Sequence, residues 1–474
     1  MTVSYQDFIA SGSFSVVTAT AILVLIVESL STRAERLSCW LSLAGLLAAM
    51  VMAFPSLSGS GSAYGGMLMT NGYANYFSIL FCLAGLLSIM LSYDYIRKAG
   101  IEHGEYYSLI LFAVAGMMLM AAAADLITFF LGLELMSICF YVMAGFSRKR
   151  ITSNEAALKY FLLGAFATGF LLYGIALVYG SMGSTNIAFM MTAIVLHAKG
   201  TLLPIGLGLL MVGLAFKVAA VPFHMWVPDV YEGSPTTVSG FMSTGGKAAA
   251  FSAFLLIFSP ALVNEISSVR EVLSILAAVS MIVGNVIAIS QNSIKRMLAY
   301  SSIAHAGYIL TGIVAANSAG SNGVLYYLVA YTCMNIGAFG VLSVLESSDG
   351  GNLTFDDYAG LSVRQPILSA LMAIFMFSLA GIPPFAGFFG KYYVFAGAIE
   401  GGYTWLAIIG VLMSVVSAYY YLRLVVLMYF KDQVSSIETS RSTLGMAALV
   451  ISAIALVVFG IYPSSIISLT SRFF

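Results

Sequence analysis

Two stretches of this sequence share an unusual combination of residues: GLAFKVAAVPFHMWVPDVYEGSP at 213–235 and MFSLAGIPPFAGFFGKYYVF at 376–395. Each is an apolar run that carries one lysine, Lys217 or Lys391, beside a proline. Proline inside a membrane helix removes a backbone donor and clashes with the preceding turn, so it is tolerated only where protein or a wet cavity meets the freed carbonyl groups. The stretches therefore predict two broken helices, a feature that points to the working site of a transporter.

The composition predicts an all-α, polytopic integral membrane protein. The 474 residues are 60% hydrophobic and 8% charged, against about 25% charged residues in an ordinary soluble domain. The formal net charge is zero and basic residues cluster only at 148–150, which excludes nucleic acid as a partner. The four cysteines are scattered through apolar runs, and no histidine pair has metal-binding spacing. We therefore expect no metal and no cofactor on this chain.

The chain contains enough long apolar segments for about 14 transmembrane helices, since one span needs about 20 mostly apolar residues. We expect them near 12–32, 37–55, 73–95, 105–123, 125–146, 153–180, 201–226, 235–258, 268–290, 298–316, 322–346, 366–400, 403–430 and 442–465. The segment at 366–400 is too long for one straight crossing, which agrees with a break at Pro383 and Pro384.

A weak internal symmetry predicts two repeats. AVPFHMW at 220–226 and IPPFAGF at 382–388 align on their Pro-Phe pairs, and each lies in a lysine-bearing helix. We expect helices 1–3 within residues 1–104, a first five-helix repeat (helices 4–8) at 105–258, a second (helices 9–13) at 268–430, and helix 14 within 431–474. Because five is odd, the second repeat must be inverted relative to the first.

The distribution of lysine and arginine predicts the orientation. Most lie on one side of the predicted spans, in loops or in helix turns near them: Arg33, Arg36, Arg97, Lys98, Arg148, Lys149, Arg150, Lys159, Lys295, Arg296, Arg364, Arg423, Lys431 and Arg441. Only Lys199, Arg270 and Arg472 fall on the other side. By the positive-inside rule the first side is cytoplasmic, so both termini are expected outside. The first residues lack the basic leader of a cleaved signal peptide.

Five titratable residues are predicted near the middle of the membrane: Glu134, Lys217, Lys247, His305 and Lys391. Counted at 1.5 Å per residue, Glu134, Lys217, Lys247 and Lys391 lie about 14–18 Å along their helices, in a hydrocarbon layer about 30 Å thick. His305, ten residues beyond Lys295, reaches the same depth. A lysine stem reaches only about 6 Å, so these lysines cannot extend to either surface. A charge at this depth costs about 2.5–3.5 kcal/mol, so such residues indicate function.

A lysine that gains and loses a carboxylate partner changes its affinity for protons and can act as a switch. Glu134 is the natural modulator, Lys217 its responder, and Lys247, His305 and Lys391 are candidate relay positions. Two plainer interpretations stay open: a fixed ion pair between Glu134 and a lysine, and a histidine that only packs.

Two further features lie nearer the predicted cytoplasmic side. Lys159, four residues after Glu155, is either a simple helix-surface ion pair or a point where protons come in from the cytoplasm. The tyrosines at 419–421 are expected to anchor a helix at the membrane interface.

Three stretches carry a resemblance to a known family: FHMWVPDVYEGSPTTVSGFMSTGGKAAAF at 223–251, QNSIKRMLAYSSIAHAGY at 291–308 and LAGIPPFAGFFGKYYVF at 379–395. They resemble the antiporter-like membrane subunits of respiratory complex I (NADH-quinone oxidoreductase), most closely the N type, which is subunit 2 of the mitochondrial and chloroplast complexes. The resemblance covers nearly the whole chain. One departure is the turn at 234–237, which reads SPTT where the family has a second proline.

The resemblance implies that Glu134 pairs with Lys217, that Lys247 links two half-channels and that Lys391 opens towards the outside. It implies a subunit of the bacterial inner membrane that moves protons outward while electrons pass to quinone elsewhere. NAD, FMN, iron–sulfur clusters and quinone are then expected in partner subunits of the membrane-bound complex. An Mrp-type cation/proton antiporter subunit and a non-pumping scaffold remain alternatives.

Overall fold

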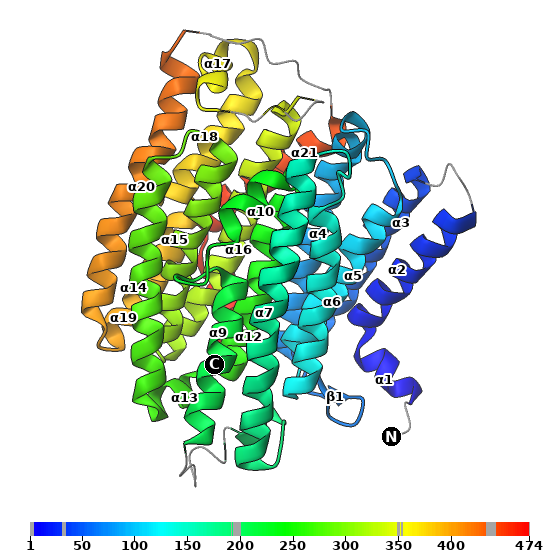
Figure 1. Ribbon diagram of the computed structural model, residues 1–474, viewed down its shortest axis with the longest axis vertical. Coiled ribbons are helices and arrows are strands. Elements are labelled where there is room, and N and C mark those ends of the chain that lie inside the picture. Colours follow the sequence, from blue (N-terminus) through cyan, green and yellow to red (C-terminus); the bar gives the residue numbers. More distant parts are fainter. Residues whose placement is uncertain are drawn as a thin grey trace.

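The computed structural model describes residues 4–30, 35–190, 192, 201–347, 351, 354–432 and 442–473. These residues form a bundle of helices (Figure 1). The strands described are β1 (Ser62–Ala63) and β2 (Leu68–Met69), which pair in an antiparallel hairpin. The predicted all-α, polytopic architecture is confirmed.

Twelve helices in the described part of the chain are long and apolar enough to cross a membrane. They are α2 (Gly12–Leu30), α3 (Glu35–Ala53) continued by the 3-10 turn η1 (Pro55–Ser58), α4 (Gly72–Lys98), α5 (Glu105–Ala122), α6 (Leu126–Ala144), α7 (Ile151–Met182), the unit α11 (Thr236–Phe241), η2 (Met242–Gly246) and α12 (Lys247–Ile257), then α14 (Ser267–Ile289), α15 (Ile294–Val314), α16 (Ser318–Leu345), α20 (Thr404–Phe430) and α21 (Thr443–Ile461). Short elements connect or flank them: α1 (Tyr5–Ala10), α13 (Pro260–Glu265), η3 (Asp356–Tyr358), α17 (Leu361–Arg364) and α22 (Ser464–Thr470).

The other two predicted spans are the broken ones. The seventh divides into α9 (Leu202–Val218) and α10 (Val227–Gly233), so the predicted break is present, but the first helix ends at Val218 and not at 226 as expected. The twelfth divides into α18 (Pro366–Ala380) and α19 (Ala386–Glu400). In each case an apolar helix ends before the prolines because the next residue adopts a left-handed backbone, φ 64° at Ala219 and φ 85° at Gly381.

The two breaks are built alike. When the Pro-Phe pairs are aligned, Ala219 falls on Gly381, and the cis peptide Val221–Pro222 falls on the cis peptide Pro383–Pro384. The local symmetry read from the sequence is therefore present in the backbone at both breaks. The boundaries of the two five-helix repeats stay a prediction.

The centre of the bundle is formed by α15, α16 and the α11–α12 unit, which are almost wholly buried. Helix α16 packs against α19, α15, α18, α11 and α21. Both broken spans therefore border a core from which lipid is excluded, as their lysines require.

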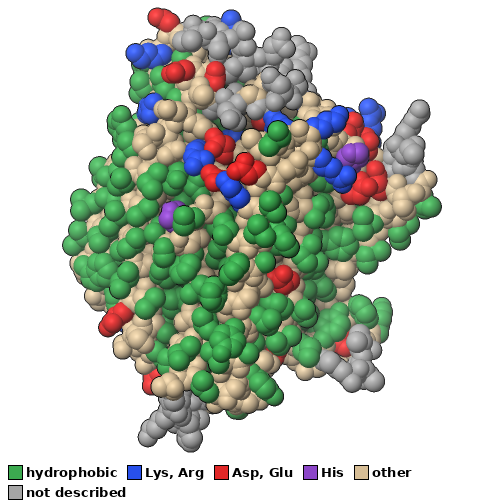
Figure 2. Space-filling model, in the orientation of Figure 1, with side chains coloured by type: hydrophobic (Ala, Val, Ile, Leu, Met, Phe, Trp, Pro, Cys, Tyr) green, Lys and Arg blue, Asp and Glu red, His purple; other side chains and the backbone are tan. Residues whose placement is uncertain are grey.

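Charge is concentrated at one end of the molecule. Lysine and arginine side chains gather at the upper end in Figure 2, whereas α1 and the chain's C-terminal end lie in the lower half of Figure 1. Of the residues used to predict orientation, Arg33, Lys199 and Arg441 lie outside the described residues.

One expectation about this end was wrong. Helix α15 begins at Ile294 and not near residue 298, because the Ser293 side chain caps it. Lys295 and Arg296 therefore belong to its first turn and not to a loop. Lys295 is buried, with 5% of its surface exposed.

Candidate functional site

Lys217 lies in the last turn of α9, directly before the first break. Its ammonium donates a hydrogen bond to Ser137 Oγ of α6 at 2.8 Å and a longer one, 3.5 Å, to the hydroxyl of Tyr141. The rings of Tyr141 and Tyr160 face it at 5.5 and 5.8 Å. The lysine is 6% exposed, so protein and not lipid surrounds it.

Glu134 lies one turn before Ser137 on α6. Its charge acts on Lys217, but among the described residues no ion pair within 4.0 Å joins the two. Glu134 Oε1 is buried and has no hydrogen-bond partner. The structure thus places the predicted partners close together, with Lys217 held by the neutral Ser137 and the carboxylate one turn away.

Lys247 is the first residue of α12 and directly follows η2, a π-helical segment. π-Helical turns inside α-helices are rare and occur often at functional sites. The ammonium donates to the carbonyl oxygen of Ser302 on α15 at 2.6 Å and also to the hydroxyl of Ser302. The ring of Tyr331 lies 5.9 Å from the ammonium, and Lys247 is 1% exposed.

His305 follows Ser302 by one turn of α15 and is bonded at both ring nitrogens. Nδ1 lies 2.8 Å from the hydroxyl of Tyr327 on α16, and Nε2 lies 3.1 Å from that of Tyr421 on α20. A hydroxyl can donate or accept, so either tautomer of the imidazole is satisfied. The histidine is packed, as the plainer interpretation expects, and it also connects three helices through groups that can exchange protons.

Lys391 is on α19 and reaches back to the second break. Its ammonium donates to the carbonyl oxygens of Leu379 and Ala380, the last residues of α18, at 3.0 and 2.9 Å, and to Ser414 Oγ of α20 at 2.7 Å. A cation is favourable at the C-terminal end of a helix, where carbonyl groups have no partner within the helix. The break itself therefore supplies the acceptors for this lysine.

Aromatic side chains connect these positions. The ring of Tyr331 faces Lys247 and lies 5.2 Å from the imidazole of His305. The ring of Tyr308 lies 5.6 Å from the same imidazole and 5.1 Å from the ammonium of Lys391. Three of the predicted relay residues thus lie along one buried row, whereas Lys217 lies apart on α9.

The hydroxyl groups of this row were not predicted from the sequence, and two of the tyrosines at 419–421 lie elsewhere than expected. Tyr420 and Tyr421 are buried and not interfacial, because they face the bundle while Tyr419 points outward and is 60% exposed. Tyr420 donates to Asn285, whose amide in turn donates to the hydroxyl of Tyr308. Tyrosines at mid-span were a usable signal, because a buried tyrosine hydroxyl usually has a partner.

Lys159 belongs to a separate charged network near the lysine-rich end. It pairs with Glu155, as one of the two interpretations predicted, and with Asp229 of α10, each at 2.7 Å. Asp229 also pairs with Arg296 at 2.9 Å. Partial burial opposes ionisation of Asp229, but the hydrogen bonds from Lys159 and Arg296 prevail and hold its pKa below the usual value.

Residues 123–417 match the transmembrane family described as NADH:quinone oxidoreductase/Mrp antiporter. The NADH-quinone oxidoreductase subunit N of Trichlorobacter lovleyi is 48% identical over 453 residues, which cover 95% of this chain and 93% of the relative. A chain of respiratory complex I from Thermus thermophilus has a TM-score of 0.84 at 33% identity and covers 97% of this chain and 99% of its own length.

A chain of the Mrp complex from Dietzia sp. has a TM-score of 0.87 at 20% identity, over 98% of this chain and 96% of that chain, and shares the fold alone. Similarity of fold does not separate the complex I chain from the Mrp chain, but sequence identity does. The chain therefore belongs to the NADH:quinone oxidoreductase/Mrp antiporter family of multi-pass membrane proteins and, within it, to the relatives of subunit N.

Proposed function

We propose that this chain is the proton-translocating subunit N of a bacterial NADH-quinone oxidoreductase, embedded in the inner membrane with both termini outside. Partner subunits of the membrane arm surround it, and further partners carry NAD, FMN, iron–sulfur clusters and quinone. The sequence identity to subunit N relatives and the match to a complex I chain support this assignment. The crowding of lysine and arginine at the end opposite the termini supports the orientation.

One observation carries the proposal: three buried lysines lie at helix irregularities and are held by neutral oxygens. Lys217 precedes one break, Lys247 follows the π-helical segment, and Lys391 caps the other break. A fixed structural role would favour a carboxylate partner for each buried ammonium, because an unpaired buried charge is costly. Neutral partners suit a lysine that takes up and releases protons.

The geometry around Lys217 supplies the switch. Glu134 and Ser137 lie one turn, about 5 Å, apart on α6, and a lysine side chain of about 6 Å can swing between them. A lysine holds its proton more firmly beside a carboxylate than beside a hydroxyl. Movement of Lys217 from Glu134 to Ser137 therefore weakens its hold on its proton, and the resulting change of charge on α9, which packs against α12, drives proton transfer at Lys247.

From Lys247 the proton follows the buried row. Ser302, Tyr331 and His305 lead from α12 to the centre of the bundle, and Tyr308 leads on to Lys391. His305 and its two tyrosine partners can each give one proton and accept another. Lys391, held at the second break, releases the proton to the outside.

The test is Lys247→Ala in the assembled complex in sealed vesicles. We expect the number of protons moved per quinone reduced to fall, while the complex still assembles. Lys431→Ala is the matched control, because this lysine is exposed just after α20. Native proton stoichiometry in the Lys247→Ala complex would refute the relay and favour a scaffold.

The second candidate function is cation/proton exchange of the Mrp type, favoured only by the shared fold. The purified chain in vesicles with a sodium gradient distinguishes the two. Sodium-driven proton movement without any redox partner would support exchange. No sodium-driven proton movement by the isolated chain, together with pumping in the complex, supports the subunit N assignment.

A further inference from the structure

A cavity of about 590 Å³ opens among the start of α7, α10 and the end of α16, at the lysine-rich end of the molecule. Charged side chains line much of it. Asp229 and Lys159 line one part, and Arg150, Lys295 and Glu346 line another. The ion pairs of Lys159 and Asp229 do not involve Lys295 and Glu346, the buried charged residues of this cavity.

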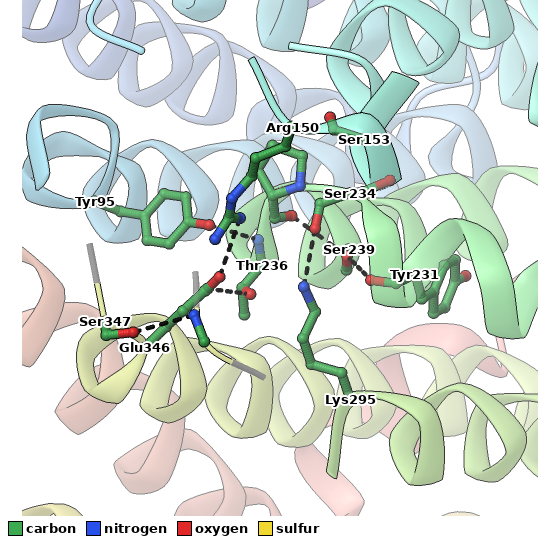
Figure 3. Close-up of polar contacts among 12 residues, drawn as sticks. Tyr95, Arg150, Ser153, Tyr231, Ser234, Thr236, Ser239, Lys295, Glu346 and Ser347 are labelled. Carbon is green, nitrogen blue, oxygen red and sulfur yellow. Dashed lines mark hydrogen bonds and ion pairs between the residues drawn. The ribbon is translucent and has the colours of Figure 1, made fainter. Parts of the chain in front are cut away.

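Glu346 is the buried acid of this cavity. It directly follows α16 and is 5% exposed. Its Oε2 accepts a hydrogen bond of 2.5 Å from Thr236 Oγ1, and its Oε1 lies 3.4 Å from Nη1 of Arg150 (Figure 3). The hydroxyl of Tyr95 lies beside the same group and accepts a bond from the backbone N–H of Thr236.

The position of Glu346 is unfavourable for a purely structural carboxylate. The C-terminal end of a helix carries partial negative charge, so lysine or arginine stabilises it and glutamate does not. The contact with Arg150 is long for a charge-assisted hydrogen bond, which normally measures about 2.7–2.9 Å. Glu346 is therefore held in place while its charge is only partly compensated.

Lys295 lines the same cavity, on the first turn of α15. Its ammonium donates to the carbonyl oxygen of Ser234 at 2.9 Å, and the charge of Glu346 acts on it. The hydroxyl of Ser234 is buried and unpartnered. Lys295 and Ser302 are seven residues apart, two turns of the same helix face or about 10 Å, and Ser302 holds Lys247.

We infer that this cavity is the intake through which protons reach the buried lysines, with Glu346 as the first acceptor and Lys295 as the second. The inference rests on the proposed function. The Glu346 carboxylate takes a proton from a hydronium ion in the cavity, which leaves water, and becomes a neutral acid. It passes that proton to the Lys295 amine and is restored as a carboxylate beside Arg150. The Lys295 ammonium then returns to an amine as water carries the proton along α15 to Ser302 and Lys247.

The first test is Glu346→Gln in the assembled complex, because glutamine keeps the shape and the acceptor for Thr236 but cannot exchange a proton. We expect at least a tenfold fall in protons moved per quinone reduced, and partial recovery with Glu346→Asp. Glu102→Gln is the control, since Glu102 pairs with Arg97 at 2.7 Å outside the cavity. Native pumping by Glu346→Gln beside a failed Lys247→Ala complex refutes the intake alone; native pumping by both refutes the proposed function.

A second test does not depend on altering Glu346. Thr152 lines the cavity and is exposed, whereas the four native cysteines are buried. A membrane-impermeant thiol reagent of the methanethiosulfonate type is applied to Thr152→Cys, with Ser290→Cys, exposed on the same end, as the control. We expect labelling at 152 to stop pumping and labelling at 290 to leave it unchanged. Full labelling at 152 with native pumping would overturn the inference.

Discussion

Ser137→Ala tests whether Lys217 has two resting positions. Ser137 is fully buried, and its hydroxyl is the close partner of the Lys217 ammonium, at 2.8 Å. After the substitution, the contact that remains is the hydroxyl of Tyr141 at 3.5 Å. A hydrogen bond to a charged group contributes about 1.5–3 kcal/mol. The balance between the Ser137 and Glu134 positions should therefore shift by about 10- to 150-fold towards Glu134, at 1.4 kcal/mol per factor of ten.

The assay is the initial rate of proton movement in vesicles, measured together with quinone reduction by the same complex. We expect pumping to fall about tenfold or more, because Lys217 stays beside the carboxylate and releases its proton rarely. Ser78→Ala is the matched control: Ser78 is also buried in a long helix, and its hydroxyl bonds the carbonyl four residues earlier, as the hydroxyl of Ser137 bonds that of Leu133. That variant should pump normally.

An experimental structure of the Ser137→Ala complex completes the test. We expect the Lys217 ammonium within 4 Å of Glu134, which is the usual limit for an ion pair. If Lys217 moves to Glu134 and pumping stays native, the switch is refuted, because holding the lysine at the carboxylate would then be harmless.

Three further predictions concern the breaks and the two ends of the molecule. Gly381→Ala and Gly402→Ala should each cost about 1–2 kcal/mol of stability, since both glycines have positive φ (85° and 84°). Only Gly381→Ala should also reduce pumping, because its Cβ would lie 3.1 Å from the Lys391 side chain, whereas Gly402 faces open space. Arg270→Ala should lower the free energy of unfolding by about 3 kcal/mol, because it removes the donors to the carbonyl groups of Val314, Ala315 and Gly401 at the ends of α15 and α19. Thermal melting in detergent measures this loss. Full recovery by Arg270→Lys would contradict the need for the forked guanidinium group. The pKa of Asp229 is lowered in the folded chain, so its ion pairs contribute to stability above its unfolded pKa of about 4, and this contribution is lost as pH falls through the folded pKa. The difference in melting temperature between the native chain and Asp229→Asn should therefore narrow on acidification. A widening difference would contradict the ion pairs of Asp229 as a source of stability.

The spans and their breaks were predictable because few physical terms decide them. Length and apolarity identify a crossing, and proline in an apolar run identifies an interruption. The end of the seventh helix was predicted too late, because the left-handed turn at Ala219 comes before Pro222 and no composition signal marks an alanine for that conformation. The start of α15 was also missed, although Ser293 ahead of an apolar run is a usable capping signal.

The burial of the lysines was predictable, but their partners were not. Counting residues along a helix predicted that Lys217, Lys247 and Lys391 are buried, and each is at most 6% exposed. Whether Lys217 bonds Glu134 or Ser137 depends on one side-chain rotation, which spacing does not determine. The partners of His305 come from α16 and α20, helices whose faces only the packed bundle defines.

The breaks and the lysines are parts of one arrangement. In an unbroken membrane helix the backbone carbonyl groups accept hydrogen bonds within the helix, so no acceptor is left for a lysine ammonium. A break frees the carbonyls of the last turn: those of Leu379 and Ala380 bind Lys391, and at the other break that of Phe216 accepts from the indole of Trp226. Backbone carbonyls satisfy a cation without taking its proton, unlike a carboxylate, which would hold the charge in place. A chain that places lysines beside its own broken helices can therefore keep them buried and still leave their protons free to move.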